Sequence, residues 1–445
     1  MRRPNILFLM CDEHRPDVTG YEGNPVIRTP TLDWLAETGT RFDNAYTPSP
    51  ICIPARQCMM TGQLPRTCGV EHYGQDLPPF ADTFARRLAT VGYNTVCCGK
   101  LHHMGPDQMQ GWTHRPAGDV SVADRDRDIR SEAWDDIVKP GRLKWSDAKE
   151  IYRAGPGSAR HNRFDRRWTQ AAEDFIENYF GDLMYDRPDS HRPLLLKLSL
   201  IEPHYPYFCD AEKFAWYLNR VEPFTESETF DHPFLSERQV VPGRDVSERE
   251  LRRATAAYYG MIEQADEHFA AVLAKLRQMG QDLDDWLIIY TSDHGEMLGE
   301  HGIWEKQKFF EASARVPLLI RYPRGYEGGR VVRQNVNLCD LYATLCEIGG
   351  VDVPDGLDSR SLTGLLAGDA DGWDNESVSQ FGGRNLMIKR DDLKYQWYGP
   401  EMPEVLFDLS QDPGERQNVI DEPSCAQAVQ AFRARRDELG FGEQQ

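Results

Sequence analysis

Side chains that could bind a cation or a small anion recur in this sequence where predicted strands end and loops begin. The clusters are Asp12-Glu13, Cys52–Arg56, Gly99–His103 with Glu202–His204, and Ser292–Gly295 with Trp304–Lys306. Carboxylate oxygens and a histidine nitrogen suit a divalent cation such as Ca²⁺ or Mg²⁺. Lysines and histidines beside them would neutralise charge that develops on a transferred anionic group. Together the clusters predict metal-assisted hydrolysis of a phosphate or sulfate ester.

Each cluster taken alone also fits a structural role. A carboxylate after a strand often caps a helix or a turn, and a buried cysteine is usually an inert apolar side chain. Cys52, however, leads into a predicted helix, Ala55–Met60, and a residue at a helix N-terminus beside a metal is well placed as an activated nucleophile. The joint occurrence of the clusters therefore favours the catalytic interpretation.

Strand and helix patterns alternate along most of the chain and predict how the clusters are positioned. This alternation is typical of right-handed βαβ crossovers, which build a mostly parallel sheet flanked by helices and bind ligands at the strands' carboxyl ends. The predicted strands are Asn5–Cys11, Tyr93–Cys98, Leu194–Ile201, Trp286–Ser292 and Val316–Tyr322. The predicted helices are Thr31–Thr38, Phe80–Val91, Arg166–Phe180, Glu248–Met279 and Asn337–Ile348.

The pattern changes after about residue 355 to short strands separated by turn signals. These strands are Ser377–Phe381, Asn385–Lys389, Leu393–Tyr398 and Val405–Leu409. They predict a small antiparallel sheet docked on the main domain. A length of 445 residues agrees with one large and one small domain. We therefore predict an α/β catalytic domain over residues 1–355 and an α+β C-terminal subdomain over 356–445.

Two long stretches interrupt the alternation, residues 117–165 and 205–247. Insertions of this length in an α/β domain are typically pocket walls or subunit contacts. We expect them to shape the substrate pocket, and we expect the protein to be a homo-oligomer.

Charge and hydropathy exclude several classes of function. The chain has 51 Lys+Arg against 71 Asp+Glu, a formal net charge of −20, which does not suit binding to nucleic acid or to an anionic membrane. Mean hydropathy is −0.60, and no apolar run approaches the ~20 residues that span a bilayer. The short apolar run behind Arg2-Arg3 lacks a small-residue cleavage site. With ten scattered cysteines and no CxxC pair, these features predict a reduced, cytoplasmic protein, or a periplasmic one had a leader been removed.

The sequence resembles a known family in motifs that extend over nearly the whole chain. Cys52-Ile-Pro-Ala-Arg56 matches the C-x-P-x-R signature of type I sulfatases, members of the alkaline phosphatase superfamily. The motifs that accompany it are Pro4–Phe8 with Asp12, Thr29–Asp33, Phe42–Ala45, Met60–Gln63, Gly99-Lys100 with His102, Pro203–Pro206, Asp293–Gly295, Lys306 with Arg315–Pro317, and Leu406–Leu409 with Asp412–Glu415. The resemblance implies an alkaline phosphatase-like fold.

The resemblance also implies a mechanism. In this family a maturase converts the signature cysteine, here Cys52, to formylglycine, an aldehyde that hydrates to a geminal diol. One hydroxyl attacks sulfur and releases the alcohol, and the second then loses its proton and expels sulfate. The substrate would be a small or saccharide-linked sulfate ester. Arg56 and Lys100 would stabilise the diol, His102 would move protons at the nucleophile, and His204 and Lys306 would contact sulfate and assist the leaving oxygen.

By the same resemblance the cation, Ca²⁺ with Mg²⁺ or Mn²⁺ as alternatives, would be held by Asp12, Asp293, His294 and the modified Cys52. Two positions depart from many relatives: Glu13 stands where a second aspartate is common, and His294 stands in place of asparagine. Glu13 is therefore an additional candidate ligand. His294, together with Gly99–Gln108, is similar to the branch that contains choline sulfatases and phosphonate monoester hydrolases.

Three alternatives to sulfate ester hydrolysis follow from the same residues. A phosphonate monoester or phosphate diester has a group of the same size and tetrahedral shape, so the same site could act on it or on both classes. A non-catalytic, metal-binding descendant of the fold would keep an unmodified Cys52. A hydrolase that uses the Cys52 thiolate would need a His/Asp partner arrangement.

Overall fold

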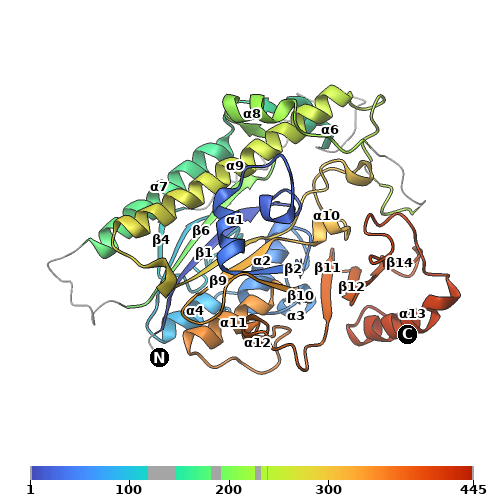
Figure 1. Cartoon of the computed structure of the whole chain (residues 1–445). Helices are drawn as coiled ribbons and strands as arrows, with labels where there is room; N and C mark the ends of the chain where they lie inside the picture. Colours follow the sequence, from blue (N-terminus) through green and yellow to red (C-terminus); the bar gives the residue numbers. More distant parts are fainter. Residues whose placement is uncertain (1–2, 119–146, 182–191, 226–231, 238, 443–445) are drawn as a thin grey trace.

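The computed structural model describes residues 3–118, 147–181, 192–225, 232–237 and 239–442 (Figure 1). Its centre is an eight-stranded sheet in the order β10-β2-β9-β8-β1-β6-β3-β4. The strands are β1 Asn5–Asp12, β2 Thr40–Tyr46, β3 Asn94–Gly99, β4 His114–Ala117, β6 Leu194–Pro203, β8 Trp286–Ser292, β9 Leu318–Arg321 and β10 Arg330–Asn337. Every pairing is parallel except those of β9 with β2 and β8. The predicted α/β class with a mostly parallel sheet is confirmed.

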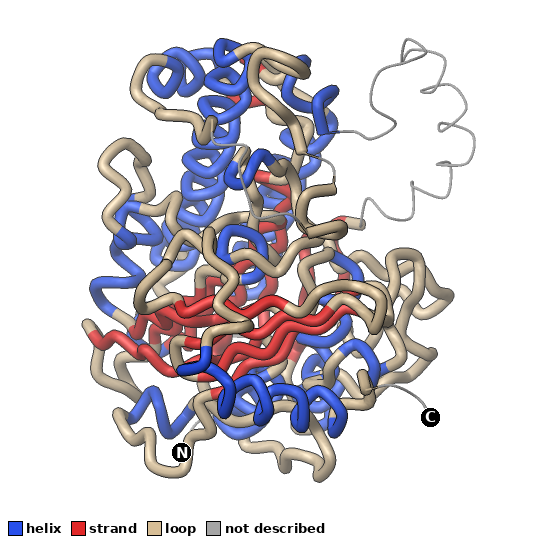
Figure 2. Tube along the Cα trace, turned by 90° about the vertical axis from the view of Figure 1, so that its right-hand side faces the viewer, coloured by secondary structure: helices blue, strands red, loops and turns tan. Residues whose placement is uncertain are grey.

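Helices cover both faces of this sheet, as the two views show (Figures 1 and 2). One apolar cluster packs α1, α7 and α9 on the sheet, and another packs α2, α4 and α11. The helices are α1 Pro30–Thr38, α2 Cys52–Thr61, α3 Pro65–Cys68, α4 Phe84–Thr90, α6 Asp147–Arg153, α7 Arg160–Phe180, α8 Ala211–Leu218, α9 Glu248–Gln278, α10 Glu311–Ala314, α11 Asp340–Gly349, α12 Thr363–Ala367 and α13 Ala426–Glu438. Burial on both faces explains why β1, β6 and β8 are continuous apolar runs.

The sequence pattern missed β2, β4 and β10; β2 and β10 contain many charged and polar residues and so form no apolar run. Strand β10 lies at one edge of the sheet, where several of its side chains reach solvent. The strand predicted at Val316–Tyr322 is β9, which runs antiparallel to both of its neighbours. Helix α7 begins at Arg160, six residues before the predicted start, so part of the first interrupting stretch is helical. Much of that stretch, residues 119–146, lies outside the described residues.

The C-terminal region forms the predicted antiparallel sheet in the order β11-β12-β13-β14 (Figure 1). Its strands are Glu376–Phe381, Asn385–Arg390, Leu393–Trp397 and Val405–Asp408. Cys58 and Leu64 share an apolar cluster with Val378 and Leu386 of this sheet. Buried Lys394 of β13 pairs with Glu311 at 2.8 Å and with Glu415 at 2.7 Å. Apolar packing and an ion pair thus join the small sheet to the catalytic part, and the division near residue 355 stays a prediction.

A short two-stranded sheet, β5 Gly155–Pro156 with β7 Phe208–Cys209, lies among α6, α8 and α9. Among the described residues, no helix combines the length and apolar character that crossing a membrane requires.

Candidate active site

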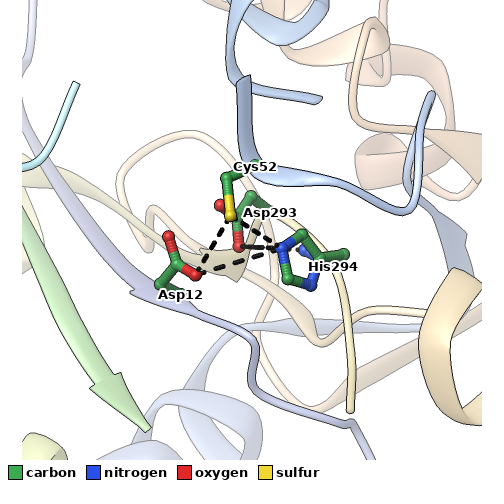
Figure 3. Close-up of side chains that lie close together, drawn as sticks. All are labelled: Asp12, Cys52, Asp293 and His294. Atoms are coloured by element: carbon green, nitrogen blue, oxygen red, sulfur yellow. Dashed lines mark hydrogen bonds and ion pairs between the residues drawn. The ribbon is translucent and has the colours of Figure 1, made fainter. Parts of the chain in front are cut away.

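Side chains from two strand ends and one helix meet at the carboxyl edge of the large sheet (Figure 3). Asp12 ends β1, Asp293 and His294 follow β8, and Cys52 is the first residue of α2. Because β1 and β8 are adjacent and parallel, their carboxyl ends bring these residues side by side. The structure therefore brings together the four predicted cation ligands.

These four side chains are buried and converge on one point. The Cys52 Sγ lies 3.5 Å from Asp12 Oδ1 and 3.2 Å from His294 Nε2. His294 Nε2 lies 3.9 Å from Asp12 Oδ1 and 3.8 Å from Asp293 Oδ1. One ligand atom from each residue lies within 4.8 Å of all the others. Two carboxylate oxygens, an imidazole nitrogen and the position-52 side chain form a donor set that fits a hard divalent cation.

Arg56 contacts one carboxylate oxygen of Asp12 and one of Asp293, and the other oxygen of each lies toward the cluster. Its Nη2 donates to Asp12 Oδ2 at 2.8 Å and its Nε donates to Asp293 Oδ2 at 2.7 Å. Lys100 Nζ also lies 2.6 Å from Asp12 Oδ2. The Oδ1 atoms are thereby directed toward Cys52 and His294. Burial alone would raise the pKa of Asp12, but Lys100 and Arg56 lower it well below its usual value, so Asp12 is ionised.

The tautomer of His294 also suits a cation. Its Nδ1 lies 2.9 Å from the Gly295 carbonyl oxygen, and a carbonyl can only accept, so Nδ1 carries the hydrogen. The lone pair of Nε2 consequently faces Cys52 and Asp12. Burial lowers the pKa of His294, although Asp293 opposes that shift, and a neutral imidazole is the form that binds metals.

The C-x-P-x-R spacing explains why Cys52 and Arg56 act at one place. They are four residues apart on α2 and therefore share a face of the helix. Ile51 is extended, with φ −158°, and the helix begins at Cys52, so the positive end of the helix dipole lies at the cysteine. Arg56 Nη1 is held by the Lys100 carbonyl at 2.8 Å and by Ser199 Oγ at 2.9 Å. Ser199 lies inside β6 and has no motif around it, so sequence reasoning missed it.

A second group, Glu13, His204 and Lys306, lies beside the first. Lys306 Nζ is 2.7 Å from Glu13 Oε2 and 2.7 Å from His204 Nε2. His204 Nδ1 donates to the Tyr205 carbonyl at 2.6 Å, which leaves Nε2 to accept from the ammonium. Burial and then Lys306 lower the pKa of His204 well below its usual value, so this imidazole is neutral. Burial alone would lower the pKa of Lys306, but Glu13 raises it well above the usual value, so the ammonium stays charged.

Glu13 is placed toward this second group by an unusual backbone conformation. Its φ is +70°, a left-handed value that costs a non-glycine residue about 1–3 kcal/mol. Left-handed backbone also occurs at His102, and at Glu305 and Gln307 on either side of Lys306. Glu13 Oε2 contacts Lys306, while its buried Oε1 has no hydrogen-bond partner among the described residues. Ligation of a cation by Glu13 stays a prediction.

His102 and three nearby aromatic residues, Tyr205, Tyr207 and Trp112, have separate surroundings. The His102 ring packs edge-on against Tyr73, whose hydroxyl lies 3.4 Å from Nε2, and its role at the nucleophile stays a prediction. Tyr205 stacks on His204, with ring centroids 4.1 Å apart, and so borders the site. Trp112 and Tyr207 are buried, Trp112 against Phe84 and Tyr207 with its hydroxyl on Glu296, so they are structural.

The loop that carries His204 depends on two buried acids. Asp165 of α7 accepts the backbone N–H of Ile201 at 2.9 Å and that of Glu202 at 2.8 Å. Glu202 Oε1 in turn accepts from Asn162 and Gln264, so α7 and α9 both hold the end of β6. Sequence reasoning found Glu202 beside His204 but not Asp165, which looks like any polar residue of an amphipathic helix.

Comparisons with known proteins agree with this geometry. The family profile described as Sulfatase matches residues 4–351, and that of the N-sulphoglucosamine sulphohydrolase C-terminal region matches residues 299–440. An arylsulfatase of Clostridium perfringens is 28% identical over 97% of this chain and 93% of its own. A choline-sulfatase of Rhizobium meliloti is 31% identical over 95% of this chain and 83% of its own.

A solved structure has the same fold. The phosphonate monoester hydrolase of Agrobacterium radiobacter superposes with a TM-score of 0.78 at 24% identity, covering 98% of this chain and 95% of that chain. The predicted resemblance is thus confirmed by profile, by sequence and by architecture. The chain belongs to the sulfatase family and is a sulfatase, a hydrolase of sulfuric esters.

Proposed function

We propose that this sulfatase cleaves a sulfate monoester with a formylglycine made from Cys52 and a divalent cation beside it. The observation that carries the proposal is the way the carboxylate oxygens of the buried cluster are oriented. Arg56 takes the Oδ2 atoms of Asp12 and Asp293, and the Oδ1 atoms converge with His294 Nε2 on position 52. The family's signature places its modified residue at this same position.

Asp12, Asp293, His294 and the residue at position 52 would hold the cation, and Ca²⁺ fits a set dominated by oxygen. When bound, it would polarise the sulfate oxygens and the nucleophile. The hydrated aldehyde would supply one hydroxyl to attack sulfur and a second whose deprotonation releases sulfate. Conversion of Cys52 would require a maturase as partner.

The chain's own residues supply the charge and the proton transfers. Arg56 and Lys100 are held against Asp12 and lie next to position 52, where they orient the nucleophile. Lys306 is an ammonium donor already aligned on His204 Nε2. We assign the leaving-group side to this pair, with Lys306 as the charged donor and His204 as a neutral base that receives and returns a proton.

A thiolate mechanism is disfavoured by the surroundings of Cys52. Burial and the nearby Asp12 carboxylate raise the pKa of the thiol to about 11, so an unmodified Cys52 would be a protonated, weak nucleophile at neutral pH. His294 presents its lone pair to Cys52 but is oriented by Gly295 and not by a carboxylate. These features fit an oxidised position 52 better than a cysteine hydrolase.

A second candidate is hydrolysis of a phosphonate monoester or phosphate diester at the same site. The observation that favours it is His294, which in this branch of the family accompanies both choline sulfatases and phosphonate monoester hydrolases. Sulfate monoesters and phosphonate monoesters are both tetrahedral monoanions, so the same cationic groups serve either. Relative kcat/KM for paired aryl sulfate and aryl phosphonate esters separates the two candidates.

Mass spectrometry of the tryptic peptide tests the proposal directly. Trypsin cuts after Arg41 and Arg56, so the peptide 42–56 contains Cys52 and no other cysteine. In protein from a host with the maturase we expect this peptide to carry an aldehyde that reacts with a hydrazide probe. A free, alkylatable thiol at position 52 in fully active enzyme would refute the formylglycine proposal.

A further inference from the structure

A pair of thiols lies one helical turn beyond the catalytic end of α2. Cys58 Sγ and Cys68 Sγ are 3.6 Å apart, and the two residues belong to α2 and to the short helix α3. A disulfide bond requires sulfurs about 2 Å apart, so a displacement of under 2 Å would join them. None of the ten cysteines forms a disulfide in this structure, and neither of these two belongs to the cation cluster.

The two thiols differ in access. Cys58 is fully buried, in an apolar cluster with Leu64 and Cys339. Cys68 is half-buried at the last residue of α3, before Gly69, which has a left-handed φ of +75°. A small reagent in solvent is therefore expected to react with Cys68 before it reacts with Cys58.

The hydrogen bond between the thiols favours the same order. The hydrogen bond to Cys58 lowers the pKa of Cys68, whereas burial raises the pKa of Cys58 well above its usual value. A half-buried sulfur with thiolate character next to a protonated buried thiol is the arrangement of an attacking and a resolving cysteine.

We propose that Cys58 and Cys68 form a redox-active dithiol that closes to a disulfide when the protein meets a peroxide. In the first step the Cys68 thiolate attacks one oxygen of hydrogen peroxide, the O–O bond breaks, and a sulfenic acid and hydroxide form. In the second step Cys58 loses its proton, its sulfur attacks the Cys68 sulfur, and the S–O bond breaks to release water. Two thiols are oxidised and one peroxide is reduced to two waters.

The side that moves on closure is α3, because α2 is held more firmly. All ten residues of α2 are buried, and Arg56 anchors it to Asp12, Asp293 and Ser199. Helix α3 has four residues and exposes part of Cys68. Closure therefore leaves position 52 and Arg56 in place and adds a covalent link between α2 and α3.

Peptide mapping after peroxide titration tests this proposal. Trypsin cuts after Arg56 and Arg66, so Cys58 and Cys68 fall in separate peptides, 57–66 and 67–86, and both are separate from Cys52. We expect one disulfide-linked species that joins these two peptides and disappears on reduction. We expect kcat to stay within a factor of two and the apparent Tm to rise by about 2–5 °C, because the link closes a short loop in the unfolded chain.

Three variants make the result decisive. Cys68→Ser changes a half-buried residue, and this variant should lose both the linked peptides and the Tm rise. Cys339→Ser should keep both, because Cys339 Sγ donates to the Gln63 carbonyl instead. Cys425 is also half-buried, and its Sγ lies 4.0 Å from the Ser424 hydroxyl, so Cys425→Ser serves as the matched control for access. Oxidation of Cys68 to sulfinic acid with Cys58 still alkylatable, or a link from Cys68 to Cys339, would overturn the proposal.

Discussion

The two halves of the candidate site are built on different plans. Around Asp12, Asp293 and His294 the contacts outside the cluster include hydrogen bonds to Arg56 and to backbone groups, and one ligand atom of each residue lies within 4.8 Å of the others. Around Glu13, His204 and Lys306 the groups contact one another, with Lys306 Nζ placed between Glu13 Oε2 and His204 Nε2. The first half is therefore prepared for a ligand the chain does not supply, whereas the second must exchange an internal contact for the substrate.

This difference means that substitutions should act through different observables. Changes in the first half should alter cation binding and the integrity of the nucleophile. Changes in the second half should alter the dependence of the rate on leaving group and pH.

The largest effect is expected for Cys52→Ala. Removal of the nucleophile should lower kcat/KM on an aryl sulfate by roughly 10⁴-fold or more, because the other groups act only with it. The fold should persist, with a circular dichroism spectrum like that of the wild type. Cys346→Ala, a buried cysteine on α11, is the matched control and should keep its activity. Comparable turnover by both variants would refute the assignment of position 52.

The next effect is on stability and tests the cation half. Arg56→Met leaves two buried carboxylates without their guanidinium, a loss of about 3–5 kcal/mol for a buried pair. We expect a lower Tm in a chelator and a larger rise of Tm with added Ca²⁺ than in wild type, because the cation then offsets both charges. Arg321→Met removes another buried arginine, paired with Asp284, and should lose stability without added calcium dependence. Equal calcium shifts in both variants would contradict the cation site.

The second half should respond to the leaving group. Lys306→Met should lower kcat/KM by about 10²–10³-fold for an alkyl sulfate and much less for a nitrophenyl sulfate, because a good leaving group needs no acid. Glu13→Gln removes the carboxylate that raises the pKa of Lys306 but leaves the amine in place, so it should cost less, about tenfold. A uniform loss across leaving groups would show that Lys306 binds sulfate and does not assist departure.

The smallest effect is a change in pH profile. In wild type His204 is neutral because burial and Lys306 lower its pKa, so kcat/KM should show no His204 inflection near pH 6.5. Lys306→Met removes one of these causes, so the pKa of His204 rises and an acidic limb should enter the profile. Lys308→Met, whose ammonium lies over the Phe234 ring, is the control and should keep the wild-type shape. Identical profiles for the two variants would contradict the proposed coupling.

The fold was predictable where one physical signal dominated. Strands β1, β6 and β8 are buried on both faces, so their sequences are unbroken apolar runs, and Asp12 and Asp293 stand out at their ends. Strand β2 alternates buried and half-exposed residues and gives no such run. Its position between β10 and β9 depends on long-range pairing that local pattern does not encode.

The site was predictable to a similar extent. Motif residues Cys52, Arg56, Asp293 and His294 meet as expected. The reason is that the carboxyl ends of adjacent parallel strands lie at the same edge of the sheet. The contact of Glu13 with Lys306 joins residues 293 positions apart. It also depends on a left-handed backbone at Glu13, which the neighbouring residue types do not predict. Ser199 and Asp165 act through hydrogen bonds from ordinary strand and helix positions, where no motif surrounds them.

The apolar cluster that covers Cys58 at the far end of α2 draws most of its other members from a later part of the polypeptide, Val378 through Phe441. A ribosome completes α2 hundreds of residues before it makes them, because domains acquire structure from the N-terminus onward. Until those residues are made, this helix lacks that part of its cover. An enzyme that modifies Cys52, as proposed, would have that interval in which to work.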